Sequence, residues 1–144
     1  MAREKADMAS VRAHRPLGQR PDCRGALAQA LGEKRGITRF ADATVPMDES
    51  LCRAALDLSG RGSLHARIEF PTASVGEFDV ELVEEFLGAF FKQAGINGHV
   101  DVLRGTNSHH VAEAVFKAVA RALRAAVETD PRKGDAIPST KGAL

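Results

Sequence analysis

The chain has 144 residues, 20 of them basic and 19 acidic, with a formal net charge of +1. This length suits a single domain with a real core, and the balanced charge offers no general attraction for nucleic acid or an anionic membrane. No apolar run approaches the roughly 20 residues of a membrane span, and Cys23 and Cys52 are too few for a disulfide framework, so we expect a cytoplasmic protein with free thiols.

Residues 1–24 are rich in arginine, contain two prolines and show no helical or strand periodicity. We interpret them as an unmatched segment, disordered or mistranslated. An Ala/Leu pattern over residues 25–34 predicts a short helix, which the following basic residues and glycine end. Residues 37–45 then predict a strand that ends at Pro46.

Alternating apolar residues predict strands over residues 52–58 and 63–70. The glycine-containing turn at residues 59–62 favours a hairpin between them. Asp79 stands where a helix cap belongs, and apolar residues recur after it at helical spacing as far as Phe91. This helix must cover a sheet.

The next alternating segment, residues 99–103, predicts another strand, and Asn107 or Ser108 caps a long helix that reaches Val127. The element order predicts an α+β fold in which two helices pack on one face of a mixed β-sheet. Two prolines and two glycines over residues 130–144 predict a loop or tail.

His109, His110 and Glu113 open the long helix and project at roughly 0°, 100° and 40° around its axis. Adjacent histidines that diverge by about 100° do not easily reach one ion, so as ligands they would serve two ions. The alternative is a solvated helix face, on which Glu113 forms a surface pair with Lys117.

Arg39, Arg61 and Lys141 lie beside turns or strand ends, where a cation can meet a phosphate or remain solvated. The tail around Ser139 and Lys141 either wraps a phosphate with its backbone or is disordered. Paired acids on a helix exterior, such as Glu85 and its neighbour, usually serve solubility. Residues 48–49 are expected to cap or start a short helical turn.

Six short strings occur in one order along residues 25–144. Together they resemble the C-terminal half of imidazoleglycerol-phosphate dehydratase, so the resemblance implies one half of a duplicated dehydratase fold. The strings are GITRF (36–40), PMDES (46–50), LDLSGR (56–61), VEEF (83–86), NSHHVAEAVFKAVARAL (107–123) and PSTKGAL (138–144).

The resemblance also implies roles for individual residues. Glu113 is a possible catalytic residue, although the base is not identified, and Glu85 stands where many members have a histidine ligand. The implied substrate-binding residues are Arg39, Arg61, Ser139 and Lys141, and the implied manganese ligands are His109, His110, Glu113 and Glu85.

The implied activity is the removal of water from imidazole glycerol phosphate to give imidazole acetol phosphate, in histidine biosynthesis. Two manganese ions per site and a homo-oligomer of 24 subunits are further implications. The first-half metal motif of the family does not occur in residues 1–24, so we expect little activity from this chain alone. One alternative is a truncated, non-catalytic metal-binding fragment, and a weaker one is a metal-dependent hydrolase.

Overall fold

The computed structural model describes residues 23–142. Its main sheet has four strands in the order β1-β2-β6-β3, and a small second sheet pairs β4 with β5. The strands are β1 (Phe40–Met47), β2 (Ser50–Asp57), β3 (Ser63–Arg67), β4 (Ser74–Val75), β5 (Phe78–Asp79) and β6 (Asn97–Arg104). The helices are α2 (Cys23–Leu31), α3 (Glu81–Ala94) and α4 (Ser108–Val127).

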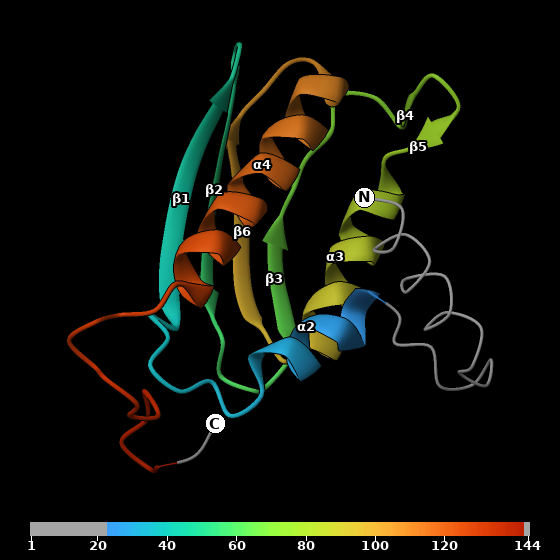
Figure 1. Cartoon of the computed structure of the whole chain (residues 1–144). Helices are drawn as coiled ribbons and strands as arrows, with labels where there is room; N and C mark the ends of the chain where they lie inside the picture. Colours follow the sequence, from blue (N-terminus) through green and yellow to red (C-terminus); the bar gives the residue numbers. More distant parts are fainter. Residues whose placement is uncertain (1–22, 143–144) are drawn as a thin grey trace, which may run out of the picture.

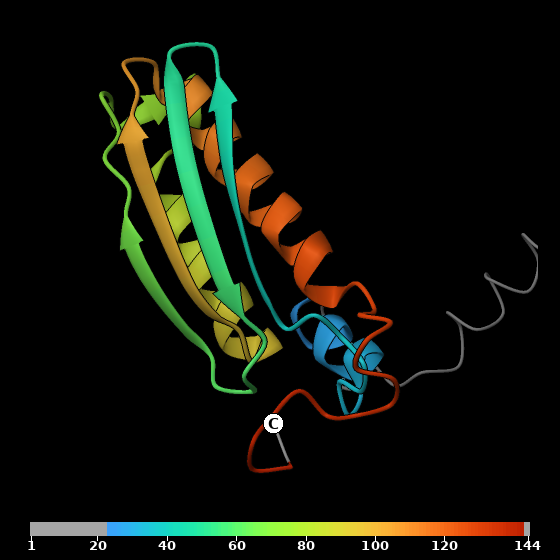
Figure 2. The same cartoon turned by 90° about the vertical axis from the view of Figure 1, so that its left-hand side faces the viewer.

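The two long helices cover the same face of the main sheet. Helix α4 packs on β1 and β2, whereas α3 packs on β3 and β6 (Figures 1 and 2). The short α2 packs against α3 at one end of the molecule. This layered arrangement confirms the predicted α+β fold with a mixed sheet and two helices on one face.

The core lies between these layers and follows the predicted periodicities. Alternate residues of β2, namely Cys52, Ala54 and Leu56, are buried toward the helices. The buried stripe of α3 includes Phe91, which is fully buried, and ends at Ala94. A Cβ on Gly98 would stand 2.1 Å from the Phe91 ring, so this strand position must be glycine for the ring to pack.

The predicted hairpin between residues 52–58 and 63–70 is wrong. Strand β6 lies between β2 and β3, antiparallel to β2 and parallel to β3. Strands β3 and β6 are therefore parallel neighbours, and α3 connects them in a crossover that packs on one face of the sheet. The glycines of the connection serve close packing: a Cβ on Gly62 would stand 2.4 Å from the Cα of Lys92.

Two boundary predictions at β1 also need correction. The strand does not end at Pro46 but continues through it to Met47, which is tolerated because β1 is an edge strand. Residues 48–49 form no helical turn. Met47 pairs with Ser50, so the two residues between them make the tight turn of the β1–β2 hairpin.

The remaining element predictions agree with the structure within a few residues. Helix α4 begins and ends where predicted. Helix α3 begins at Glu81, and the Asp79 carboxylate accepts a hydrogen bond from the Glu81 N–H, although Val80 occupies the cap position. Among the described residues no helix is both long and apolar enough to cross a membrane.

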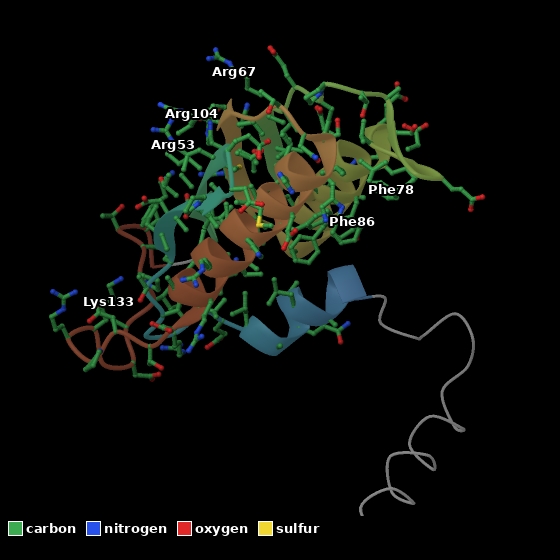
Figure 3. The ribbon with its side chains drawn as sticks, turned by 90° about the horizontal axis from the view of Figure 1, so that it is seen from above. Arg53, Arg67, Phe78, Phe86, Arg104 and Lys133 are labelled. Carbon is green, nitrogen blue, oxygen red and sulfur yellow. The ribbon has the colours of Figure 1, made fainter. Side chains whose placement is uncertain are left out.

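An apolar surface remains open on the helix layer. Phe86 of α3 packs against Phe116 of α4 with ring centroids 5.9 Å apart, yet 47% of Phe86 and 40% of Phe116 are exposed. In Figure 3, Phe86 and Phe78 lie on the opposite side of the molecule from Arg53 and Arg67 of the sheet. This surface links the two long helices on the side away from the sheet.

Candidate functional site

The first turn of α4 is held in place by its cap and by a loop. The Asn107 side chain accepts hydrogen bonds from the backbone N–H groups of His109 (2.9 Å) and His110 (3.3 Å). The Ser108 hydroxyl lies 2.8 Å from that of Thr72 and accepts a hydrogen bond from the Thr72 N–H. The helix start, and with it both histidines, therefore has a defined position.

The two histidine rings point to different partners, as helix geometry predicts. The Nε2 atom of His109 lies 3.5 Å from the Glu113 carboxylate, one turn along the same helix. His110 faces the β1–β2 turn, with Nδ1 2.7 Å from Glu49 and Nε2 3.4 Å from Asp48. We call these five residues the histidine end of the molecule: Asp48, Glu49, His109, His110 and Glu113.

Glu49 carries most of the hydrogen bonds at the histidine end. Its Oε1 accepts from the backbone N–H groups of Thr106 and Asn107 and from the Ser50 hydroxyl. The bond to His110, followed by the backbone bond from Thr106, lowers the pKa of Glu49 from 4.5 to about 2. The same bond raises the pKa of His110 above 6.5, so the pair favours the ionic form.

Glu113 is bound to a lysine on its other side. Lys117 donates to Glu113 at 2.7 Å, and this hydrogen bond is the main reason that the pKa of the carboxylate is lowered. A carboxylate with a lowered pKa is a weaker proton acceptor and a good anionic ligand. The geometry therefore suits Glu113 better as a ligand than as a base.

The predicted metal ligands do not all lie together. Glu85 is exposed on α3 and lines a separate cavity of ≈ 290 Å³ with Val80 and Glu81. In residues 23–142 no group of three histidine, cysteine, aspartate or glutamate side chains is arranged to hold one ion. The roles of His109, His110, Glu113 and Glu85 as ligands remain predictions.

The four residues predicted to bind substrate do lie together. Arg39, Arg61, Ser139 and Lys141 line one open cavity of ≈ 380 Å³. They come from the start of β1, the β2–β3 connection and the C-terminal tail. We call these four residues the arginine end, because two arginines flank the cavity.

The cations of the arginine end differ in what they contact. Arg39 has a positive φ of 75°, binds Asp57 at 2.7 Å and donates to the Pro138 carbonyl at 2.6 Å. In the described part of the chain no carboxylate pairs with Arg61 or Lys141, and both residues are exposed. Arg39 therefore fastens the tail, whereas the other two cations remain available to an anion.

Two turns shape the walls of this cavity. The Ser59 hydroxyl accepts from the Arg61 N–H at 3.3 Å, and the Ser139 hydroxyl accepts from the Lys141 N–H at 3.2 Å. Close by, burial lowers the pKa of Lys34, and the positive charge of Arg39 lowers it further. Three cations therefore line the cavity, of which Arg39 is paired with Asp57, and the predicted tail contributes one of its walls.

The two ends lie at opposite ends of the sheet. Glu49 directly precedes β2, and Asp57, which holds Arg39, is the last residue of that strand. Eight residues at about 3.3 Å each separate the two carboxylates by roughly 26 Å. Figure 1 shows the same separation: the β1–β2 turn and the start of α4 are at the top, and the tail is at the bottom.

The residue patterns missed Asp48, Glu49 and Lys117 as members of a site. The sequence predicts a helical turn at Asp48 and Glu49, and a surface pair between Lys117 and Glu113. The available signal was a two-residue gap between two alternating strands, which predicts a hairpin turn at residues 48–49. No local pattern indicates that this turn meets the start of α4.

Comparison with known proteins identifies related sequences over most of the chain. The family model described as imidazoleglycerol-phosphate dehydratase matches residues 23–123. The imidazoleglycerol-phosphate dehydratase of Ruegeria pomeroyi is 63% identical over 119 residues, which cover 83% of this chain and 61% of the relative. That of Roseobacter denitrificans is 62% identical with the same coverage. The chain spans about three fifths of the length of these relatives.

Solved structures show the same similarity. The imidazoleglycerol-phosphate dehydratase of Staphylococcus aureus has a TM-score of 0.70 at 40% identity, covering 72% of this chain and 60% of that one. A structure of IGPD from Pyrococcus furiosus, in complex with (S)-C348, has a TM-score of 0.73 at 34% identity. The match covers 84% of this chain and 65% of that one. Both structures therefore extend beyond the part that this chain matches.

Proposed function

Because this chain belongs to the imidazoleglycerol-phosphate dehydratase family, we propose that it contributes one part of a site that dehydrates imidazole glycerol phosphate to imidazole acetol phosphate. The observation that carries this proposal is the arginine end. Four residues from three segments distant in sequence meet around one basic cavity of ≈ 380 Å³, and two of its cations have no acidic partner among the described residues. Such a cavity suits the phosphate of the substrate.

The histidine end fits a metal ion by the chemistry of its donors. Imidazole nitrogens and carboxylate oxygens are suitable ligands for manganese, and the cap bonds of Asn107 fix the backbone of both histidines. We propose His109, His110 and Glu113 as ligands, with Glu85 as a fourth from a different surface. When bound, manganese supplies a Lewis acid for the charge that develops on the substrate ring.

The separation of the two ends determines how they act. Roughly 26 Å is far longer than a substrate in which a short carbon chain joins ring and phosphate. One substrate therefore cannot contact both ends of the same chain. We propose a homo-oligomer in which the arginine end of one copy faces the histidine end of another, or of a segment that the longer relatives contain and this chain does not match.

Each end then has a separate task. Arg61 and Lys141 bind the phosphate and fix the position of the substrate. The elimination of water then costs little further translational or rotational entropy. The histidine end orients the ring. The proton is removed by a carboxylate, for which Glu113 is less suitable because it is bound to Lys117. We place this enzyme in the cytoplasm, in keeping with a biosynthetic role.

The test is reconstitution. The 144-residue chain is assayed with imidazole glycerol phosphate and Mn²⁺, alone and mixed with the N-terminal portion of the Ruegeria pomeroyi relative. We expect turnover only in the mixture, and loss of turnover when the mixture contains Lys141→Ala. No turnover in the mixture, under conditions in which the intact relative is active, would contradict the proposal.

A further inference from the structure

Glu49 connects the β1–β2 turn to the start of α4. One carboxylate oxygen accepts from the backbone N–H groups of Thr106 (3.1 Å) and Asn107 (2.9 Å), and from the Ser50 hydroxyl (3.0 Å). The other oxygen lies 2.7 Å from Nδ1 of His110. Three donors thus hold one oxygen of the Glu49 carboxylate, so the position of the carboxylate does not depend on its contact with His110.

This arrangement determines which ring nitrogen of His110 carries hydrogen. An ionised carboxylate only accepts hydrogen bonds, so a contact of 2.7 Å places the proton on Nδ1. In the neutral ring, Nε2 then has the free lone pair that a metal ion requires. The Asp48 carboxylate, 3.4 Å from Nε2, provides a second oxygen on that side of the ring.

We propose that Glu49 is a positioning residue, which fixes the orientation and tautomer of His110 so that Nε2 is directed to the metal ion. The inference rests on the proposed function, because it assigns His110 as a ligand. Glu49 itself touches neither metal nor substrate. A carboxylate that holds the second nitrogen of a histidine ligand is a common way to orient the ring and raise its basicity.

Among the described residues, no carboxylate contacts Nδ1 of the neighbouring His109, in contrast to His110. Nδ1 of His109 makes no hydrogen bond within residues 23–142, and the His109 side chain is 64% exposed, compared with 26% for His110. His109 must therefore be ordered when a metal binds, whereas His110 is already oriented. We expect the ion bound by His110 to bind first and more tightly.

The experiment compares Glu49→Gln with the native chain. Glutamine keeps the size and one acceptor oxygen but loses the charge that holds hydrogen on Nδ1. Glu69→Gln removes one charge from an exposed acid elsewhere and is the matched control. The first measurement is the pair of ¹⁵N shifts of His110 in metal-free protein, at a pH where the ring is neutral. The second is Mn²⁺ affinity, from the electron paramagnetic resonance signal of free Mn²⁺.

We expect His110 to have hydrogen on Nδ1 in the native chain and in Glu69→Gln, and to shift toward hydrogen on Nε2 in Glu49→Gln. The Mn²⁺ affinity of Glu49→Gln should fall by about tenfold to a hundredfold, as for other partners of metal-binding histidines. If Glu49→Gln does not fold, Glu49→Asp retains the charge and moves it away from Nδ1, and the same two measurements apply.

The two readouts separate this inference from the proposed function. An unchanged tautomer in the Glu49 variant overturns the positioning role, whatever the metal measurement gives. A changed tautomer together with unchanged Mn²⁺ affinity overturns it as well, because the ring orientation would not matter for the ion. If the tautomer changes in the Glu49 variant but the native chain binds no Mn²⁺, the control of the ring by Glu49 is supported and the manganese assignment is contradicted.

Discussion

The histidine end and the arginine end are built in opposite ways. The histidine end joins a tight hairpin turn to a capped helix start, and Glu49 bonds to both. At the arginine end, loops and the C-terminal tail surround a cavity. Arg39 holds the tail there by its bonds to Asp57 and to the Pro138 carbonyl. Each contains a non-glycine residue with positive φ, Asp48 at 47° and Arg39 at 75°. Backbone strain of this kind is retained where the surrounding structure holds it, and it often marks functional positions.

The comparison shows that hydrogen bonds fix side chains at the histidine end, whereas the arginine end leaves cations available to bind an anion. At the histidine end Glu49 already holds one ring, that of His110, in place, and His110 is a proposed metal ligand. At the arginine end Arg61 and Lys141 have no acidic partner in the described residues, so an anion finds unpaired charge. In the proposed function this division would let the histidine end orient the ring of the substrate while the arginine end binds its phosphate.

The largest expected effect is on metal binding at the histidine end. His110→Ala removes a proposed ligand and should weaken Mn²⁺ binding more than about a hundredfold, because losing a ligand costs more than losing its outer partner. His65→Ala, which removes an exposed histidine of the sheet, is the control and should bind Mn²⁺ as the native chain does. Equal affinities of the two variants would show that the histidine end is not the metal site.

The rigidity of the histidine end is tested next, by stability. A Cβ on Gly105 would stand 2.4 Å from a methyl group of Val111 and 2.7 Å from the Ser50 hydroxyl. Gly105→Ala should therefore lower the free energy of unfolding by about 1–3 kcal/mol, the usual cost of overpacking. Gly88→Ala has only a contact at 3.9 Å and lies within α3, so it should be neutral or stabilising. Urea denaturation of both variants measures the difference.

The availability of the arginine end is tested with inorganic phosphate. Lys141→Ala removes an exposed, unpaired cation and should weaken phosphate binding about tenfold, the loss expected for one charged hydrogen bond. Lys92→Ala, which removes a lysine of α3, should have no such effect. Neither variant should change Mn²⁺ affinity. A parallel loss of both affinities would show that the ends are coupled and would contradict their separation in this chain.

The smallest expected effect is the pH dependence of stability from the Glu49–His110 pair. The folded pKa of Glu49 is lowered to about 2, so its contribution is present above pH 4.5 and is lost as pH falls toward 2. The folded pKa of His110 is raised, so its contribution is present below pH 6.5 and is lost as pH rises through the raised value.

Both contributions are therefore present between pH 4.5 and 6.5. Melting temperatures of the native chain and Glu49→Gln should differ most in this window, and less at 1 M salt because the pair is solvent-accessible. A difference that is constant with pH would show that the pair does not titrate with folding.

The parts of the fold that were predicted correctly depend on local periodicity. The apolar stripes of α3 and α4 and the alternation along β2 and β6 specify which face is buried, so the two-helix layer followed from the sequence. Asn107 was one of the two predicted caps, and the structure selects it, because its side chain accepts hydrogen bonds from N–H groups within the next three residues. These interactions span less than one helical turn.

The errors concern pairing between distant segments. The glycines of residues 59–62 were interpreted as a hairpin turn, but they pack against α3 while β6 takes the place beside β2. Nothing local distinguishes these two uses of glycine, because both require the absence of a side chain. Likewise, the turn at residues 48–49 joins the candidate site only through its contact with the start of α4, about 60 residues later.

The sequence by itself determined the α+β layering, the divergence of His109 and His110 and, through its resemblance to a known family, the four residues of the arginine end. Periodicity and motif order are properties of the chain, so they can be recognised without coordinates. Only the tertiary structure decided that Glu49 holds His110, that Arg39 fastens the tail, and that the two ends lie at opposite ends of the sheet. Those facts depend on which strands pair and which loops meet, and such long-range contacts are selected by the packing of the whole domain.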